Sequence, residues 1–419
     1  MKALCRSSIS MNDLASRTFD RPDSPGDARR AALACMATLA VALGVGRFAF
    51  TPLLPLMLQS GELDIRHGGW LASLNYAGYF LGAIGCVALR VDAARVVKTG
   101  LASTVLLVLA MGMTHQFWVW AVVRFVAGAV SAWTFVFASQ WGLRRLAELG
   151  ANEWGGVIYT GPGFGIAATG LLVSAAGGVG ATAGWIGFGL VSAVLAALVW
   201  RTLGTASTVQ ATASTITHAD ARGASPPVHA HLHRADAFWL IALYAVPGFG
   251  YIITATFLPV IARAALPVDS PWPDLFWPMF GGALVAGALA GARLPPHWDN
   301  RTLLAGCYVV QALGILAGIV SPTAGGFALG SALIGLPFTA ITLFAMREAR
   351  RLHGNNAAGL MGYATAAYGL GQIAGPLVAA PIAAHTGSFT PALWLAAIAL
   401  VAGAVGLVAV TRMRPAPRG

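Results

Sequence analysis

Positive charge alternates along this chain in a way that constrains how it can cross a membrane. Twelve apolar stretches, each long enough to span a bilayer, are joined by polar connections. The two tails and the even-numbered connections, counted with Lys98 and Arg201 at the adjoining span ends, carry 22 of the 26 Lys and Arg residues, whereas the odd-numbered connections carry only Arg66 and Arg263. Lys and Arg collect on the cytoplasmic side of membrane proteins. The alternation therefore predicts an all-α membrane protein with twelve transmembrane helices and both termini in the cytoplasm.

The composition supports this class and excludes others. The chain is 57% hydrophobic and only 10% charged, whereas soluble domains carry about 25% charged residues. Its net charge of +11 is spread over the predicted cytoplasmic connections, so topology explains it and no nucleic-acid partner is predicted. The four cysteines lack metal or redox spacing, and no phosphate loop or catalytic set is visible. We predict no enzyme activity, no cofactor and no metal site.

The chain is expected to divide into five segments. Its polar beginning leaves Met1 and Met11 as alternative starts, and the apolar stretch that follows is too long for a cleavable signal, so the first helix should be retained. A single long connection, rich in Pro, Ser and Thr, separates two halves of six helices. The expected segments are a disordered cytoplasmic tail at 1–30, a first half at 31–201, a cytoplasmic linker at 202–236, a second half at 237–411 and a cytoplasmic tail at 412–419.

The two halves are predicted to be related by an internal repeat. A shift of 204 residues places Pro55 on Pro259 in helices 1 and 7, and the same shift places Tyr159 on Tyr363 in helices 5 and 11. Helices 1 and 7 run in the same direction, so the repeat is parallel. In transporters built from such halves, the substrate site lies near the midplane between them. The expected spans are 31–58, 69–89, 97–114, 117–141, 154–176, 184–201, 237–262, 274–292, 302–320, 324–346, 356–384 and 391–411.

Two arginines lie inside apolar stretches, Arg47 in helix 1 and Arg124 in helix 4. At 1.5 Å per residue, both are expected in the outer half of a hydrocarbon core about 30 Å thick. A charge at that depth costs at least ~2.5 kcal/mol and should face a cavity or a partner rather than lipid. These two residues are therefore the first candidates for a functional site.

No acidic partner for these arginines is visible, because all fifteen Asp and Glu lie in tails, connections or at helix ends. In one reading a substrate anion supplies the counter-charge, since the guanidinium fork suits carboxylates and phosphates. In the other, each arginine bonds backbone carbonyls freed by nearby Gly and Pro, or is hydrated in the cavity. A co-transported proton would travel with the substrate or through groups at helix ends (Asp274, Glu153, His385), or there is none.

Helix-breaking residues mark helices 1, 5 and 7. Pro52 and Pro55 in helix 1 and Pro259 in helix 7 remove backbone donors, and we predict bends there at matching depth. Corresponding bends in two halves point to a transport site, although a kink that only helps packing is the alternative. Gly161 and Pro162 in helix 5 begin a stretch of small residues, which predicts an interface where helices pack or slide.

A small set of polar residues is expected to shape the pocket. Tyr251 takes the place of Arg47 under the repeat, and Asn75 and Tyr79 lie deep in helix 2. Most other deep polar residues are expected to form interhelical hydrogen bonds. Alternating histidines in the linker suit a metal site in principle but are more often incidental. They are His229, His231 and His233.

In four stretches, Gly44–Pro55, Leu74–Gly82, Tyr159–Gly165 and Gly369–Pro376, the sequence resembles the YbfB/YjiJ-type branch of the major facilitator superfamily. The resemblance spans about 30–412 and implies the major facilitator fold and a bacterial inner-membrane transporter. It is carried by Gly44-Val-Gly-Arg-Phe-Ala-Phe-Thr-Pro-Leu-Leu-Pro55, Leu74-Asn-Tyr-Ala-Gly-Tyr-Phe-Leu-Gly82, Tyr159-Thr-Gly-Pro-Gly-Phe-Gly165 and Gly369-Leu-Gly-Gln-Ile-Ala-Gly-Pro376.

Two wider superfamily motifs are partly met. Arg124-Phe-Val-Ala-Gly128 resembles the helix 4 motif of drug/proton antiporters, which implies a coupling role for Arg124. The helix 5 stretch from Gly161 resembles the antiporter signature, although Ile166 replaces its second closing glycine. The connection between helices 2 and 3 lacks the usual glycine and basic pair, so the resemblance only implies that Asp92 anchors this connection to the helix bundle.

The sequence thus favours a secondary active transporter that moves a small organic anion across the inner membrane by alternating access, working as a monomer. In this hypothesis Arg47 binds the anion, Arg124 helps or tunes coupling, and the polar residues of helices 2 and 7 shape the pocket. The first alternative is a drug or metabolite efflux antiporter, which the helix 4 and 5 motifs favour. The second, from another class, is a membrane sensor that binds a ligand without moving it.

Overall fold

The computed structural model describes residues 25–86, 91–177, 180–204, 227–295, 297–354 and 357–413, and all regular structure in them is helical. The first group of elements is α2 (Pro25–Leu39), the π-helix η1 (Ala40–Val45), α3 (Phe50–Gln59), α4 (Ile65–Gly85), α5 (Ala93–Met113), α6 (Phe117–Glu148), η3 (Asn152–Trp154), α7 (Gly155–Ile158), α8 (Gly161–Ala175), α9 (Ala181–Trp200) and η4 (Thr202–Gly204). The second group is α10 (Pro227–Ala265), α11 (Trp272–Ala292), α12 (Asn300–Val320), α13 (Ala324–Gly335), α14 (Phe338–His353), α15 (Ala358–Thr386) and α16 (Thr390–Met413).

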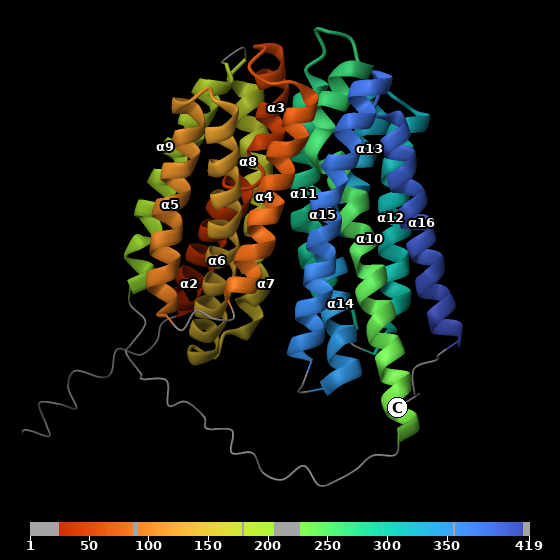
Figure 1. Ribbon diagram of the computed structural model, residues 1–419. Helices are drawn as coiled ribbons and strands as arrows, with labels where there is room; N and C mark the ends of the chain where they lie inside the picture. The colour runs from red at the N-terminus through yellow and green to blue at the C-terminus, as the bar shows by residue number, and fades with distance from the viewer. Residues whose placement is uncertain are drawn as a thin grey trace, which may run out of the picture.

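The helices stand side by side in two groups, α2 to α9 and α10 to α16 (Figure 1). In the first group α4 packs along α6 and α5 along α9, and in the second α10 packs along α15 and α12 along α16. Across the boundary α4 meets α15, α8 meets α11 and α3 meets α10. The buried residues at this boundary therefore come from both ends of the sequence.

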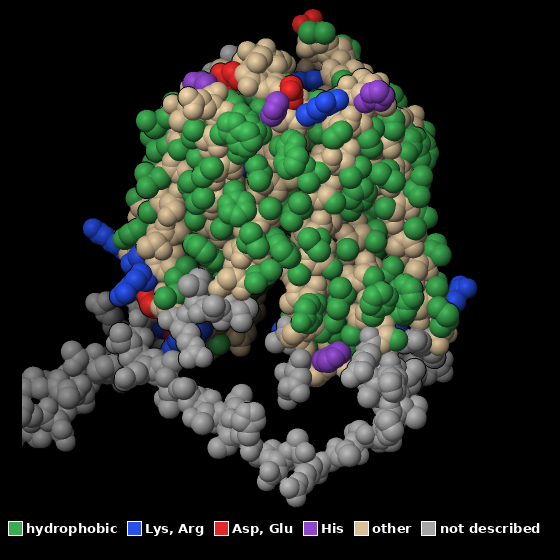
Figure 2. All heavy atoms as spheres, in the orientation of Figure 1, with side chains coloured by type: hydrophobic (Ala, Val, Ile, Leu, Met, Phe, Trp, Pro, Cys, Tyr) green, Lys and Arg blue, Asp and Glu red, His purple; other side chains and the backbone are tan. Residues whose placement is uncertain are grey.

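Eleven helices in the described residues are long and apolar enough to cross a membrane. The expected span at 69–89 corresponds to α4. Its 21 residues are long enough to cross a membrane, but its mean hydropathy is too low for it to count among the eleven. Its polar side chains explain the shortfall, since Asn75 and Tyr76 are buried against neighbouring helices and never meet lipid. Apolar side chains cover the flanks of the molecule, as a bilayer requires (Figure 2).

Three elements extend beyond the apolar stretches read from the sequence. α6 continues to Glu148, past the expected end at 141, because Arg144 and Arg145 pair with Glu148 at 3.0 and 3.3 Å on its polar last turn. α10 begins at Pro227, inside the stretch expected to be linker, and α2 begins inside the expected N-terminal tail. Residues 1–24, 205–226 and 414–419 and the side chains of the three linker histidines lie outside the described part of the structure.

Helix 1 is interrupted in its middle. α2 passes into the π-helix η1, then into a turn at 46–49, and α3 starts at Phe50. Pro52 lies in the first turn of α3, where a missing N–H costs little. The N–H of Thr51 donates to the carbonyl of Phe48 at 3.2 Å, so the carbonyl of Arg47 loses the helical partner that Thr51 would supply. The interruption thus lies just before the expected proline bend.

Helix 7 differs from helix 1, because α10 runs as one helix from Pro227 to Ala265 with Pro259 inside it. Helix 1 is thus interrupted and helix 7 is continuous, and the bends expected at the prolines at matching depth stay a prediction. Helix 5 is also broken, between α7 and α8, and Pro162 lies in the first turn of α8. A methyl group on Gly161 would collide with the main chain of Met36 in α2, so this glycine allows α8 to lie directly against helix 1.

Ion pairs hold the helix ends of the second group together. Glu348 in α14 is 1% exposed and accepts from Arg301 in α12 at 2.6 Å and from Arg351 at 2.6 Å. Arg301 also lies 3.2 Å from Asp236 in α10, so the cluster joins three helices. At the other end of α10, Arg263 pairs with Asp274 at the start of α11.

The boundary between the two groups is closed toward one face and hollowed toward the other. Ser73 in α4 donates to the carbonyl of Ile373 in α15 at 2.9 Å, and Thr51 donates to the carbonyl of Ala255 at 3.0 Å. On the face where α2 begins and α16 ends, the molecule is hollowed between the groups (Figure 2).

Candidate functional site

Arg47 lies in the turn that interrupts helix 1, at the boundary between the two groups. It is 5% exposed, and its Nη2 donates to Oε1 of Gln372 in α15 at 2.7 Å. Its Nε is buried and has no hydrogen-bond partner among the described residues. Of the five N–H donors of the guanidinium, one on Nη2 thus reaches an uncharged amide, and the one on Nε is still free.

Aromatic rings surround the guanidinium of Arg47. Its Cζ lies 4.1 Å from the ring centre of Tyr79, 5.0 Å from that of Tyr76 and 5.2 Å from that of Phe48. Rings within about 6 Å of a guanidinium attract it through their negative faces, and the attraction grows where water is excluded. These rings hold the charge in place without neutralising it.

Gln372 connects Arg47 to Tyr251. Its amide Nε2 donates to the hydroxyl of Tyr251 in α10, while its Oε1 accepts from Arg47. Gln372 is 3% exposed and Tyr251 is completely buried. The sequence placed Arg47 and Tyr251 at matching positions of the two halves, and the structure brings them together through this one side chain.

A continuous series of rings runs on from Tyr251 through the second group. Tyr251 stacks on Tyr368 with centres 6.0 Å apart, and Tyr368 stacks on Tyr244 at 5.0 Å. In the other direction Tyr251 meets Phe338 at 5.1 Å in an edge-to-face contact. Spacings of 4.5–7 Å are those that aromatic pairs prefer.

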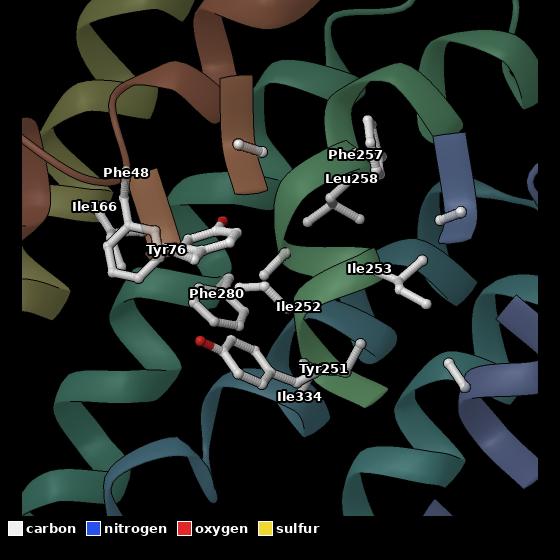
Figure 3. Packing of buried hydrophobic residues seen from close by; sticks show 14 of the residues in the cluster. Phe48, Tyr76, Ile166, Tyr251, Ile252, Ile253, Phe257, Leu258, Phe280 and Ile334 are labelled. Atoms are coloured by element: carbon white, nitrogen blue, oxygen red, sulfur yellow. The ribbon is translucent and has the colours of Figure 1, made fainter. Parts of the chain in front are cut away.

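The series returns to Arg47 through α11. Phe338 meets Phe280 at 6.2 Å, Phe280 stacks on Trp277 at 5.1 Å, and Trp277 lies 6.2 Å from Phe48. The rings of Phe48, Tyr76, Phe280 and Tyr251 gather in one region between the groups (Figure 3). We call this set of rings the aromatic belt. Its members are Tyr244, Tyr368, Tyr251, Phe338, Phe280, Trp277, Phe48, Tyr76 and Tyr79. The indole N–H of Trp277 is buried within it and has no partner among the described residues.

Arg124 is equally buried but is bound differently. Its Nη2 donates to the carbonyl of Arg47 at 3.2 Å, its Nη1 to that of Gly46 at 3.5 Å and its Nε to that of Leu71 at 3.4 Å. Its Cζ lies 4.8 Å from the ring of Phe50. The interruption of helix 1 frees carbonyls that Arg124 satisfies, so the geometry favours the structural alternative for this residue over substrate contact.

Asn75 supports the same arrangement from α4. Its Nδ2 donates to the carbonyl of Arg124 at 2.8 Å, and its Oδ1 is buried without a partner among the described residues. α4 and α6 lie close enough here for a methyl group on Gly128 to collide with the main chain of Asn75. Asn75 thus fixes the main chain that carries Arg124 rather than contacting Arg47.

Electrostatically, the site is positive. Within the described residues Glu348 is the one buried acid, and it is paired with Arg301 and Arg351 at a helix end. Neither Arg47 nor Arg124 forms an ion pair with a described acid, which agrees with the absence of deep carboxylates in the sequence. The arrangement can accept an anion at Arg47 and surround it with flat apolar walls.

The remaining sequence-predicted residues cap or shape individual helices. Asp92 caps α5 by accepting from the N–H of Arg95 at 3.0 Å, so it anchors its own helix. Pro52 and Pro55 lie in α3, Pro259 in α10, and Gly161 and Pro162 at the start of α8, where they shape helices that bound the site.

Sequence reasoning missed the most direct partner of Arg47. Gln372 was one of many deep polar residues, and nothing in the sequence links it to a residue 325 positions earlier. Phe48, Phe280 and Trp277 resembled ordinary core residues. The one available signal was that Gln372 is a buried amide in a glycine-rich stretch of helix 11, which is unusual within a span.

A family model described as "Uncharacterised MFS-type transporter YbfB" matches residues 39–408. The crystal structure of the nucleoside transporter NupG is similar with a TM-score of 0.74, covering 91% of this chain and 99% of that chain at 15% sequence identity. At that identity the likeness shows the fold alone, and it confirms the major facilitator fold. No curated protein matches the chain.

Proposed function

Because the chain belongs to the YbfB-type family of major facilitator transporters, we propose that it moves a small organic anion across a membrane by alternating access. Family membership makes it a multi-pass membrane transporter rather than an enzyme, and it favours transport over the sensor alternative. The negative charge of the substrate and the rocking of the two helix groups go beyond family membership and are our proposal.

One observation supports a negatively charged substrate, namely the incompletely partnered guanidinium of Arg47. It is buried with a free Nε, and the groups that it hydrogen-bonds, the Gln372 amide and the Tyr79 hydroxyl, are uncharged. A charge at this depth costs at least ~2.5 kcal/mol unless something compensates it. An anion that binds Arg47 would recover that cost, since charge-assisted hydrogen bonds are about twice as strong as neutral ones.

Alternating access between two parallel-repeat halves, 31–201 and 237–411, is supported by contacts at the boundary. Thr51 donates to Ala255, two positions related by the 204-residue shift, so the contact lies where an axis along the membrane normal would pass. The hollow lies on the face where α2 begins and α16 ends (Figures 1 and 2). With both termini in the cytoplasm, this arrangement would be an inward-open state of an inner-membrane transporter.

In this mechanism the groups rock about the closed contacts while substrate sits at Arg47. Pro52, Pro55 and Pro259 shape the two helices that carry Arg47 and Tyr251, and Gly161 and Pro162 allow α8 to shift against helix 1. Arg124 holds the interrupted turn, and we assign it to coupling rather than to binding. A co-transported proton would travel with the substrate or through groups at helix ends.

The experiment compares the purified full chain with Arg47→Ala, and with Arg66→Ala, an exposed arginine of the same half, as the matched control. Thermal shifts are recorded with benzoate, succinate, uridine and tetraphenylphosphonium, and any ligand that binds is then followed into proteoliposomes. A ligand at 100 times its dissociation constant adds about 2.7 kcal/mol of stability, which is readily measured.

We expect a carboxylate to stabilise the unchanged chain and Arg66→Ala but not Arg47→Ala, and Arg47→Lys to bind more weakly because it lacks the planar fork. Stabilisation by uridine or tetraphenylphosphonium that persists in Arg47→Ala would refute the anion proposal. That result would favour the efflux alternative, for which the aromatic belt also offers suitable walls.

A further inference from the structure

We propose that the substrate is an aromatic monocarboxylate, an acid with one anionic group on a flat ring. This inference rests on the proposed function and goes further, because it fixes both the number of charges and the shape of the body that carries them. Two independent features support it. These are the number of arginine donors that remain free, and the surfaces that surround them.

The number of negative charges on the substrate follows from the different hydrogen bonding of Arg47 and Arg124. All three nitrogens of the Arg124 guanidinium donate to main-chain carbonyls of Gly46, Arg47 and Leu71, so this group is already used in holding helix 1. Arg47 alone has a free buried donor and a neutral partner that a carboxylate can displace. One available cation matches one carboxylate. A second anionic group would be buried with no described cation left to receive it.

The shape follows from the aromatic belt. The ring of Tyr79 lies 4.1 Å from the Arg47 guanidinium and is only partly buried, and Tyr368 is also partly buried. In this proposal a molecule that binds Arg47 contacts the ring of Tyr79 from the first group and that of Tyr368 from the second. Flat rings stack at such faces more favourably than saturated rings of equal size, by roughly threefold to tenfold in affinity.

Displacing Gln372 also links binding to movement. In the structure its Oε1 accepts from Arg47 and its Nε2 donates to Tyr251, so it joins the two groups. A carboxylate that takes over Arg47 leaves Gln372 with Tyr251 alone. The buried indole N–H of Trp277, which has no described partner, belongs to the same aromatic belt, 6.2 Å from Phe48 between ring centres.

The test measures dissociation constants of four probes with the purified full chain. Benzoate carries the proposed features, cyclohexanecarboxylate keeps the charge without the flat ring, benzamide keeps the ring without the charge, and terephthalate adds a second charge. We expect benzoate to bind threefold to tenfold more tightly than cyclohexanecarboxylate. We expect benzamide to lose at least tenfold, and terephthalate to bind more weakly still.

Two variants of one belt residue separate stacking from folding. Tyr79→Leu should remove the preference for benzoate over cyclohexanecarboxylate, whereas Tyr79→Phe keeps the ring and should restore it within about threefold. Each variant is first checked for an unchanged melting temperature. The readout is the ratio of two affinities in the same preparation, so partial loss of folded protein does not imitate the expected effect.

The outcomes distinguish this inference from the proposed function beneath it. Equal affinity for benzoate and cyclohexanecarboxylate, or tight binding of terephthalate, would overturn the aromatic monocarboxylate while leaving an anion transporter intact. Benzamide binding as tightly as benzoate, unaffected by Arg47→Ala, would overturn both. A benzoate preference that Tyr79→Leu abolishes and Tyr79→Phe retains would support both.

Discussion

Replacing Gly128 with alanine tests how closely α4 and α6 must approach to hold Arg124 in place. A methyl group at this position would lie 2.8 Å from the main-chain N of Tyr79 and still nearer the carbonyl oxygen of Asn75. Ordinary van der Waals contact begins at 3.4 Å, so the two helices must separate by about 0.6 Å or more. Both partners are main chain, so neither can rotate away.

The separation acts directly on the hydrogen bonds between these helices. The bond from Arg124 Nε to the Leu71 carbonyl, already 3.4 Å long, would be lost, and that from Asn75 to the Arg124 carbonyl would lengthen from 2.8 Å. Overpacking costs about 1–3 kcal/mol, and each interhelical hydrogen bond about 0.6 kcal/mol. Alanine recovers up to about 1 kcal/mol of helix propensity. We expect a net loss of about 1–3 kcal/mol.

The assay is thermal unfolding of the purified protein in detergent, with Gly187→Ala as the matched control. Gly187 lies in α9 with no atom within 4 Å of the added methyl, so this variant should match the parent or exceed it slightly. We expect Gly128→Ala to unfold at a temperature lower by on the order of 2–6 °C. If both variants behaved alike, the close approach of α4 and α6 would not hold the site, and our account of Arg124 would be wrong.

Two further predictions concern contacts at the helix boundary and at the helix ends. Glu348→Gln leaves Arg301 buried without its nearest counter-charge, so we expect a loss of about 3 kcal/mol in chemical unfolding, and the exposed Glu148→Gln should have little effect. Equal effects in the two would show that the cluster contributes no more than a surface pair. Thr51→Val removes the hydrogen bond to Ala255 and costs only about 0.6 kcal/mol, but it should change the maximal exchange rate in proteoliposomes by about threefold. An unchanged rate would place this contact outside the moving interface.

The broad architecture could be predicted because the bilayer imposes it. Apolar length and the side preference of Lys and Arg identified the spans from local sequence, and α4 fell within a few residues of its expected position. The ends of α6 and α10 could not be read in this way, because these helices continue into water. There the hydropathy signal stops, although hydrogen bonding and the Arg144–Glu148 pair extend the helix.

The candidate site was predicted only in part, for a different physical reason. Arg47 and Arg124 stood out because a buried charge is costly wherever it lies. Which of the two guanidinium groups keeps an unused N–H donor depends on the hydrogen-bond acceptors around it. Those acceptors lie on helices that are distant in the sequence. The interruption of helix 1 supplies the carbonyls for Arg124, and Gln372 reaches Arg47 from another helix group. Neither contact leaves a local pattern in the sequence.

The modest hydropathy of α4 has a consequence for how the protein is made. A helix that carries Asn75, Tyr76 and Tyr79 gains less on leaving the translocon for lipid than its neighbours do. Its polar groups find partners only when α6 and the later helices arrive, and the Asn75 amide then bonds the main chain of α6. We therefore expect α4 to enter the bilayer as part of a helix pair rather than alone, so that biogenesis of the first half waits for its fourth span.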